Sequence, residues 1–301
     1  MYQQSSGAIN ELVYQPGDDR AAVTAISNSG IITGWVDPAV TSADGSTQFM
    51  APVPVVWTTT GGAVELNGRP GQASAVNAGG TIVGYYDAPG HAGSAAAEWS
   101  SPTAAQTVLP ALECDHCPFP LDSANAINNA GTVAGVSLST DGPRAVVWQS
   151  GTVTSLGSFE DSGYSQALGI NNSGDVVGSA QTAQPPTYTN QDGFSHAFLY
   201  HQGVMTDLGT LAGDTDSYAS SINDKGQIIG TSSHSYNSGR AFLYHNGQIY
   251  DLNTLLDPTS ALAGSIELKQ AVSINSRGWI VANGADTRDQ FTHAFLLIPS
   301  Q

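Results

Sequence analysis

Charged residues are scarce in this chain, and basic residues are the scarcest of all. The 301 residues include 25 Asp and Glu but only 8 Lys and Arg, which gives a formal net charge of −17. The bases are scattered along the sequence and form no basic patch that would neutralise phosphate groups. We therefore expect no nucleic-acid partner, and we expect an anionic membrane surface to repel the protein.

Long apolar runs and long helical patterns are also missing. No apolar stretch approaches the roughly 20 residues that cross a bilayer as a helix, so we expect no membrane insertion. Runs of Ala, Leu, Glu and Lys at helical spacing are not sustained anywhere. The 34 glycines and the many Ser, Thr, Val and Ile residues are instead typical of an all-β protein with many turns.

The first residues do not show the basic segment followed by an apolar segment that marks a signal peptide. The protein is then either cytoplasmic or has lost a leader. Low lysine content with abundant Ser, Thr, Asn and Gly is typical of exported bacterial proteins. We expect an extracellular or periplasmic protein, and a monomer.

One pattern recurs six times, about 50 residues apart, which is close to the repeat length of propeller blades. An apolar strand ends at Ile-Asn in most copies, two residues and a glycine follow, and a β-branched strand comes next. Each copy predicts a hairpin whose asparagine caps a type I turn and whose glycine adopts positive φ. The six copies occupy residues 25–34, 75–84, 126–135, 169–178, 221–230 and 273–282.

A second pattern follows each hairpin, as in HAFLY at 196–200 and RAFLY at 240–244. It predicts a mostly buried third strand, after which a short turn and a fourth strand follow. Six units of four strands predict one all-β domain over 1–301, a six-bladed β-propeller of four-stranded blades. A β-solenoid would need shorter repeats, and tandem β-sandwiches would need longer ones. We place the blades at 22–66, 73–112, 124–157, 166–209, 218–253 and 270–298.

The sixth unit ends after its third strand, and the N-terminus offers the missing fourth. Residues 9–22 resemble residues 205–219, which form a predicted fourth strand and its connection to the next unit. We therefore expect residues 8–13 to pair with residues 293–298, so that the N-terminal strand closes the propeller and removes an exposed edge.

The repeated Ile-Asn-x-x-Gly and His-Ala-Phe patterns resemble the bacterial "HAF" extracellular repeat family. The resemblance covers nearly the whole chain and is strongest in units four to six, because PVVW and AAEW replace His-Ala-Phe in units one and two. It implies a secreted or surface-associated protein. It implies no reaction, so no catalytic residue follows from it.

In a β-propeller, the connections between blades and the loops between second and third strands lie on one face. Here these loops are rich in Asp and Tyr, which suit sugar recognition or a Ca²⁺ ion, although Asp also simply favours turns. We expect a binding module that recognises a carbohydrate or protein ligand, with no required cofactor and with Ca²⁺ as an option. The predicted ligand-binding residues are Asp19, Asp161, Tyr164, Asp214, Asp216 and Tyr218.

The rival hypothesis is a carbohydrate-active enzyme that uses the same face. A glycoside hydrolase would need two suitably separated carboxylates. A polysaccharide lyase would need a Tyr or His base near a cation, for which Tyr236, His234 and Arg288 are the candidates. A basic residue also recurs where the third strand begins, and we interpret it as structural: Arg144, His196, Arg240 and His293.

The only two cysteines form the sequence Cys114-Asp-His-Cys117. Such a pair is half of a zinc site, with His91 the nearest other histidine in sequence, or a pair of free thiols, or a local disulfide. In a chain of exported composition we expect a Cys114–Cys117 disulfide.

Overall fold

The computed structural model describes residues 12, 20–41, 47–49, 51–58, 61–66, 70–87, 93–115, 117, 121–160, 163–182, 194–234, 238–260, 262, 264–289 and 291–300. The chain forms two compact units. Unit 1 comprises residues 1–140 and 147–154, and unit 2 comprises residues 141–146 and 155–301. No helix in the described ranges is long and apolar enough to cross a membrane.

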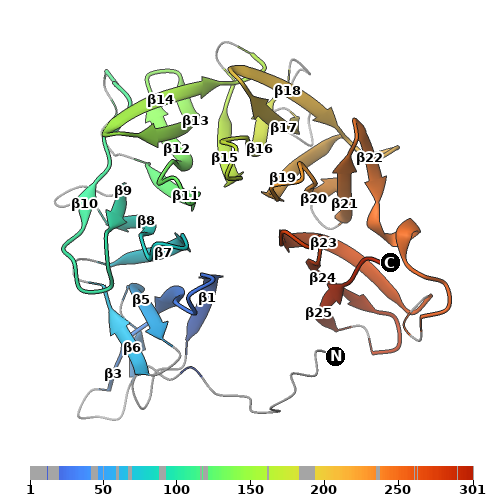
Figure 1. Cartoon of the computed structure of the whole chain (residues 1–301), viewed down its shortest axis with the longest axis horizontal. Helices are drawn as coiled ribbons and strands as arrows, with labels where there is room; N and C mark the ends of the chain where they lie inside the picture. Colours follow the sequence, from blue (N-terminus) through green and yellow to red (C-terminus); the bar gives the residue numbers. More distant parts are fainter. Residues whose placement is uncertain are drawn as a thin grey trace. The chain divides into compact units, whose positions relative to one another are not determined.

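Unit 1 contains the first two blades and most of the third (Figure 1). Blade 1 consists of β1 (Ala21–Ile26), β2 (Ile32–Val36), β5 (Val53–Thr58) and β6 (Gly61–Glu65). A two-stranded sheet, β3 (Ala39–Thr41) and β4 (Thr47–Phe49), lies between β2 and β5 in sequence. Blade 2 consists of β7 (Gly71–Val76), β8 (Ile82–Asp87), β9 (Ser94–Trp99) and β10 (Thr107–Val108). Blade 3 consists of β11 (Ser123–Ile127), β12 (Val133–Ser139), β13 (Gly142–Gln149) and β14 (Thr152–Gly157).

Unit 2 contains the rest of β13 and β14 and the three later blades. Blade 4 consists of β15 (Ser165–Ile170), β16 (Val176–Gln181), β17 (Ser195–His201) and β18 (Val204–Gly209). Blade 5 consists of β19 (Asp216–Ile222), β20 (Ile228–Ser233), β21 (Arg240–His245) and β22 (Gln248–Asp251), and a short 3₁₀ helix, η1 (Leu252–Leu255), follows it. Blade 6 consists of β23 (Ile266–Ile274), β24 (Ile280–Asp286) and β25 (Thr292–Leu297).

The strand order within each sheet is the order of the strands along the chain, which is the topology of a propeller blade. Five sheets have four strands, and the sixth has three among the described residues. The fold class predicted from the repeat, a six-bladed β-propeller, is confirmed. The expected closing strand, 8–13, lies outside the described residues apart from Leu12, so closure by the N-terminal strand stays a prediction.

The hydrophobic core lies between successive blades. In unit 2, Val177 of blade 4 packs in one cluster with Ile228 and Phe242 of blade 5. A second cluster joins Ile229 of blade 5 to Leu268 of blade 6. Blades 4 and 5 thus each bury one face against the following blade, and that burial explains why the second and third strands are the most apolar parts of the repeat.

A glycine ends five of the six repeated hairpins, and it has a packing reason, whereas the sixth copy ends at Ala282. The first strand β19 has a bulge between Ala219 and Ser221, which brings its backbone close to β20. A Cβ atom on Gly230 would collide with the carbonyl oxygen of Tyr218 and lie 2.7 Å from the ring of Phe242. Glycine at this position therefore allows both the bulge and the buried aromatic side chain.

The repeated asparagine connects blades as well as capping its own turn. Asn171 Oδ1 accepts hydrogen bonds from the backbone N–H groups of Ser173 and Asp175, at 3.0 and 2.9 Å. Its Nδ2 donates to the carbonyl oxygen of Asn223 in blade 5, at 3.4 Å. Asn223 repeats the arrangement and donates to the carbonyl oxygen of Asn275 in blade 6, at 3.0 Å.

The same bond occurs in unit 1, where Asn77 Nδ2 donates to the carbonyl oxygen of Asn128 at 3.3 Å. Four of these asparagines, at 77, 128, 171 and 223, are at most 7% exposed. A buried amide is costly unless its donor and acceptor are both satisfied. The repeated sequence predicts the turn cap but not this inter-blade bond.

We predict that Asn223→Ala lowers the free energy of unfolding by about 2–3 kcal/mol, because it removes a cap and leaves buried backbone groups unsatisfied. Urea denaturation measures this loss. The matched control is Asn275→Ala, because Asn275 caps its own turn and donates to no further blade within the described ranges. The control should lose only about 1 kcal/mol, and equal losses in the two variants would contradict a stabilising inter-blade bond.

Candidate functional site

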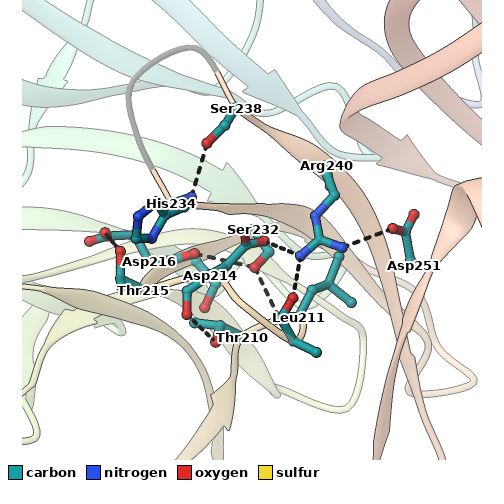
Figure 2. Close-up of polar contacts among 12 residues, drawn as sticks. Thr210, Leu211, Asp214, Thr215, Asp216, Ser232, His234, Ser238, Arg240 and Asp251 are labelled. Atoms are coloured by element: carbon teal, nitrogen blue, oxygen red, sulfur yellow. Dashed lines mark hydrogen bonds and ion pairs between the residues drawn. The ribbon is translucent and has the colours of Figure 1, made fainter.

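The connection between β18 and β19 carries two of the predicted ligand-binding residues, and its acids are engaged within the protein (Figure 2). Asp214 is 6% exposed at its side chain, and its Oδ2 lies 2.8 Å from Arg240 Nη2. Arg240 Nη2 also donates to the carbonyl oxygen of Ala212 at 2.9 Å, and Nη1 donates to Asp251 Oδ2 at 3.2 Å. Arg240 thus joins the connection to the third and fourth strands of blade 5.

Asp216 begins β19 and also has internal partners. Its Oδ1 accepts from the Ser195 N–H at 3.1 Å, and its Oδ2 accepts from Thr215 Oγ1 at 2.8 Å (Figure 2 shows Thr215 beside Asp216). The bond to Ser195 ties the connection to the third strand of blade 4. Asp214 thus has a counter-charge and Asp216 has two hydrogen bonds, and both kinds of contact offset the cost of ionised carboxylates at this connection.

A histidine holds the same connection from the side of blade 4. His196 Nδ1 lies 2.9 Å from Asp207 Oδ2, and this interaction raises the pKa of His196 against the opposing effect of burial. Burial raises the pKa of Asp207, but the hydrogen bonds from His196 and from the Gly209 N–H together outweigh it and lower that pKa. Asp216 adds a further favourable charge near His196.

The basic residue at the start of the third strand has a partner within the protein at each of its four positions. Arg144 donates to the carbonyl oxygen of Gly163, on the connection that leads into β15. Arg240 donates to the carbonyl oxygen of Ala212, on the connection between β18 and β19. In blade 6, His293 Nε2 lies 3.0 Å from Asp289 Oδ2.

Neutral polar side chains lie on the first strands, at one repeated position. Tyr218 Oη accepts a hydrogen bond from Gln270 Nε2 of blade 6 at 2.8 Å. Gln270 Oε1 accepts from Asn283 Nδ2 on β24 at 3.3 Å. In blade 4 the equivalent residue is Gln166, which is exposed and donates to Ser179 Oγ at 3.2 Å. We call Gln166, Tyr218 and Gln270 the first-strand row.

Tyr218 is among the ligand-binding residues predicted from the sequence, whereas the amides beside it are not. A signal was present, because Gln72, Gln166 and Gln270 recur at the same position of the repeat. First-strand residues of a propeller lie nearest its axis, and turn chemistry does not require glutamine there. The partners of these amides, Ser179 and Asn283, are opposite them in the strand register.

Tyr164 precedes β15 and is 52% exposed. Its backbone N–H donates to Gln181 Oε1 at 3.1 Å, and its carbonyl oxygen accepts from the Gln181 N–H at 2.8 Å. Its ring packs against Gly142 of β13, since a Cβ atom there would lie 2.7 Å from the Tyr164 ring. Tyr164 is thus an exposed aromatic side chain on a well-held backbone.

The residues proposed for a lyase are not brought together by the described interactions. Arg288 forms a two-pronged contact with Asp286, with Nε 2.9 Å from Oδ1, and this contact lowers the pKa of Asp286 to about 2. His234 is exposed on blade 5, and its backbone N–H donates to Ser238 Oγ at 3.0 Å. Tyr236 lies outside the described residues, as do Asp19 and Asp161.

The two cysteines form a local link. Cys114 and Cys117 are joined in a disulfide with a Cα–Cα distance of 5.7 Å. His91 and His116 lie outside the described residues. Among the residues that the structure does describe, no group of three or more His, Cys, Asp or Glu side chains is arranged to hold a metal ion.

Comparisons with known proteins add a similarity in fold. The chain matches no family model, and it matches no curated protein. Among solved structures it is similar to the β-propeller domain of the Trilobed protease from Pyrococcus furiosus, which is described as having an open velcro topology. The match has a TM-score of 0.41 and 10% sequence identity, and it covers 93% of each chain.

The ion pairs around Arg240 give a direct test of its structural role. Arg240→Met keeps the aliphatic stem but leaves Asp214 buried without its counter-charge. We expect the free energy of unfolding to fall by about 3 kcal/mol. This is the lower end of the range for a broken buried ion pair, and we choose it because the Arg240 side chain is 31% exposed. Urea denaturation measures it.

Adding Asp214→Asn to Arg240→Met should restore at least about 1 kcal/mol, because the uncompensated charge is then gone. The control is Arg277→Met, whose guanidinium lies over the ring of Trp279 at 5.6 Å and should contribute less than about 1 kcal/mol. A double variant no more stable than Arg240→Met would contradict the pairing.

We predict that Arg288→Ala returns the pKa of Asp286 from about 2 toward its ordinary value of 3.8. A depressed pKa stabilises the folded state above the ordinary value, and that stability disappears as the pH falls through the folded-state value. The variant should therefore lose stability relative to the parent above about pH 4, and the two should converge near pH 2. A carboxyl NMR titration reads the pKa, and an unchanged Asp286 titration would contradict the assignment.

Proposed function

We propose that this protein is a binding module that recognises a carbohydrate through the first-strand row of blades 4 to 6 and the adjoining loops. The observation that carries the proposal is chemical. The polar side chains of the first-strand row are neutral amides and a phenol, whereas Arg240 with Asp214, Arg288 with Asp286 and Lys269 with Glu267 form ion pairs.

Neutral hydrogen-bonding groups beside aromatic rings suit a polyhydroxylated ligand. Each amide both donates and accepts, so it satisfies the paired donor and acceptor character of a sugar hydroxyl. Tyr218 combines an apolar ring with a hydroxyl that can also donate. A net charge of −17 opposes a polyanionic ligand, which leaves neutral saccharides as the class that fits best.

An enzyme on the same face is supported less well. General acid–base catalysis needs titratable groups that reach a substrate in the required protonation state. The described carboxylates Asp214, Asp251 and Asp286 each have an arginine partner, and Asp216 accepts two hydrogen bonds. Such partners favour a stable loop face on which a ligand binds without being transformed.

The repeat also supports a location outside the cytoplasm. The His-Ala-Phe and Ile-Asn-x-x-Gly units resemble an extracellular repeat family, and a Cys114–Cys117 disulfide suits an oxidising compartment. We include secretion or surface association in the proposal on these two grounds.

A ligand screen tests the proposal. The melting temperature of the parent protein is measured with neutral oligosaccharides, anionic polysaccharides and Ca²⁺, because a ligand that binds only the folded state raises it. We expect stabilisation by at least one neutral oligosaccharide. Stabilisation by anionic polysaccharides alone would reject the proposal and favour a lyase, and no stabilisation by any saccharide would favour a protein ligand.

The Gln270→Ala variant links binding to the first-strand row. It should weaken binding of the selected oligosaccharide about tenfold, which corresponds to the loss of about one good hydrogen bond. The matched control is Gln248→Ala, because Gln248 is an exposed amide in the turn at the start of β22, at the opposite end of blade 5. Equal affinities in the two variants would move the site away from the row.

A further inference from the structure

Tyr164 is exposed and lies on a backbone segment that hydrogen bonds hold in place. The residue is 52% exposed and lies on the connection between blades 3 and 4. An exposed tyrosine normally loses rotational freedom when it binds a ligand, which weakens binding. A ring that is already fixed avoids most of that cost.

Three contacts fix the backbone at Tyr164. Gln181, which lies opposite it across β15 and β16, forms hydrogen bonds with both its N–H and its carbonyl group, at 3.1 and 2.8 Å. The preceding carbonyl, that of Gly163, accepts from the buried guanidinium of Arg144. The following residue, Ser165, accepts from the Ala145 N–H at 2.9 Å. The residues on both sides of Tyr164 are therefore anchored to β13.

A glycine on β13 positions the ring itself. Gly142 has a φ of 110°, a value that residues with a side chain rarely adopt. A Cβ atom at this position would lie 2.7 Å from Tyr164 Cδ1. The ring therefore rests directly against the main chain of Gly142, with no side chain between them. This contact supports one side of the ring, and the exposed fraction of the residue remains open to solvent.

An amide accompanies the ring. Gln166 lies two residues after Tyr164, and both are exposed while Ser165 between them is buried, so the alternation of β15 extends back to Tyr164. Gln166 is exposed, and its Nε2 donates to Ser179 Oγ at 3.2 Å, which leaves its Oε1 able to accept from a ligand. The face thus offers an apolar ring surface and, beside it, a directional hydrogen-bonding group.

We propose that Tyr164 is a stacking platform for the apolar face of a pyranose ring, with Gln166 binding a hydroxyl at the edge of the same sugar. This inference rests on the proposed carbohydrate-binding function and names its aromatic subsite. A pyranose fits because one side of the ring presents C–H groups to an aromatic surface while its hydroxyls point outward. The stacking depends on the ring of Tyr164 and not on its hydroxyl.

The test compares three variants by calorimetric titration with the neutral oligosaccharide selected in the screen. Tyr164→Ala should raise the Kd about tenfold, a loss typical of an aromatic contact. Tyr164→Phe should keep the parent Kd within about twofold, because the ring remains. Tyr250→Ala is the matched control, since Tyr250 is 36% exposed on the fourth strand β22 and should leave the Kd unchanged.

A further variant addresses the support of the ring. Gly142→Ala introduces the Cβ that collides with the Tyr164 ring, so it should weaken binding while Tyr164 itself is intact. The melting temperature of each variant shows whether it is folded. If Gly142→Ala is unfolded, the comparison of Tyr164→Ala with Tyr164→Phe still decides the question.

The outcomes separate this inference from the function on which it rests. Parent-like binding by Tyr164→Ala would overturn the platform and leave the carbohydrate-binding function in place. Equal losses in Tyr164→Ala and Tyr164→Phe would also overturn it, because the hydroxyl would then be the binding group. If the parent binds no saccharide, the proposed function fails and the platform fails with it.

Discussion

The buried asparagine of the repeated turn is the interaction on which the arrangement of successive blades depends. A single amide uses its oxygen within one blade and its nitrogen on the next, as Asn171 does with its own turn and with Asn223. The turn cap defines the end of the first strand in one blade. The inter-blade bond positions the corresponding turn of the next blade. The apolar clusters between blades pack at a separation that these bonds also set.

Two of the eight bases, Arg144 and Arg240, hold connections between blades. Arg144 and Arg240 each reach a carbonyl oxygen on a connection, and Arg240 also neutralises Asp214 and Asp251. In a chain with so large an excess of acids, a base used in this way removes like-charge repulsion at the loops. The residues of the first-strand row are neutral, which is why the proposed ligand is neutral as well.

The candidate site lies beside connections that contacts within the protein hold in place. The connection that carries Asp216 and the one that carries Tyr164 are both held from neighbouring strands, by Ser195 in one case and by Gln181 in the other. Structural contacts around a site favour binding because the protein loses little freedom when a ligand arrives. Asp214 and Asp216 have partners that help to fix the loops, while the amide of Gln166 is exposed and that of Gln270 is half-buried.

The sequence by itself determined the repeat, and from the repeat came the four-stranded unit, the number of blades and the all-β class. It did so because the Ile-Asn-x-x-Gly hairpin and the aromatic third strand are local patterns, each written within about ten residues. The tertiary structure alone decided which polar groups meet. Arg240 with Asp214, Gln270 with Tyr218, and Gly142 under Tyr164 join residues about 20 to 50 positions apart. A repeat shows that such residues are equivalent between units, but only the packing of one blade on the next brings particular side chains into contact.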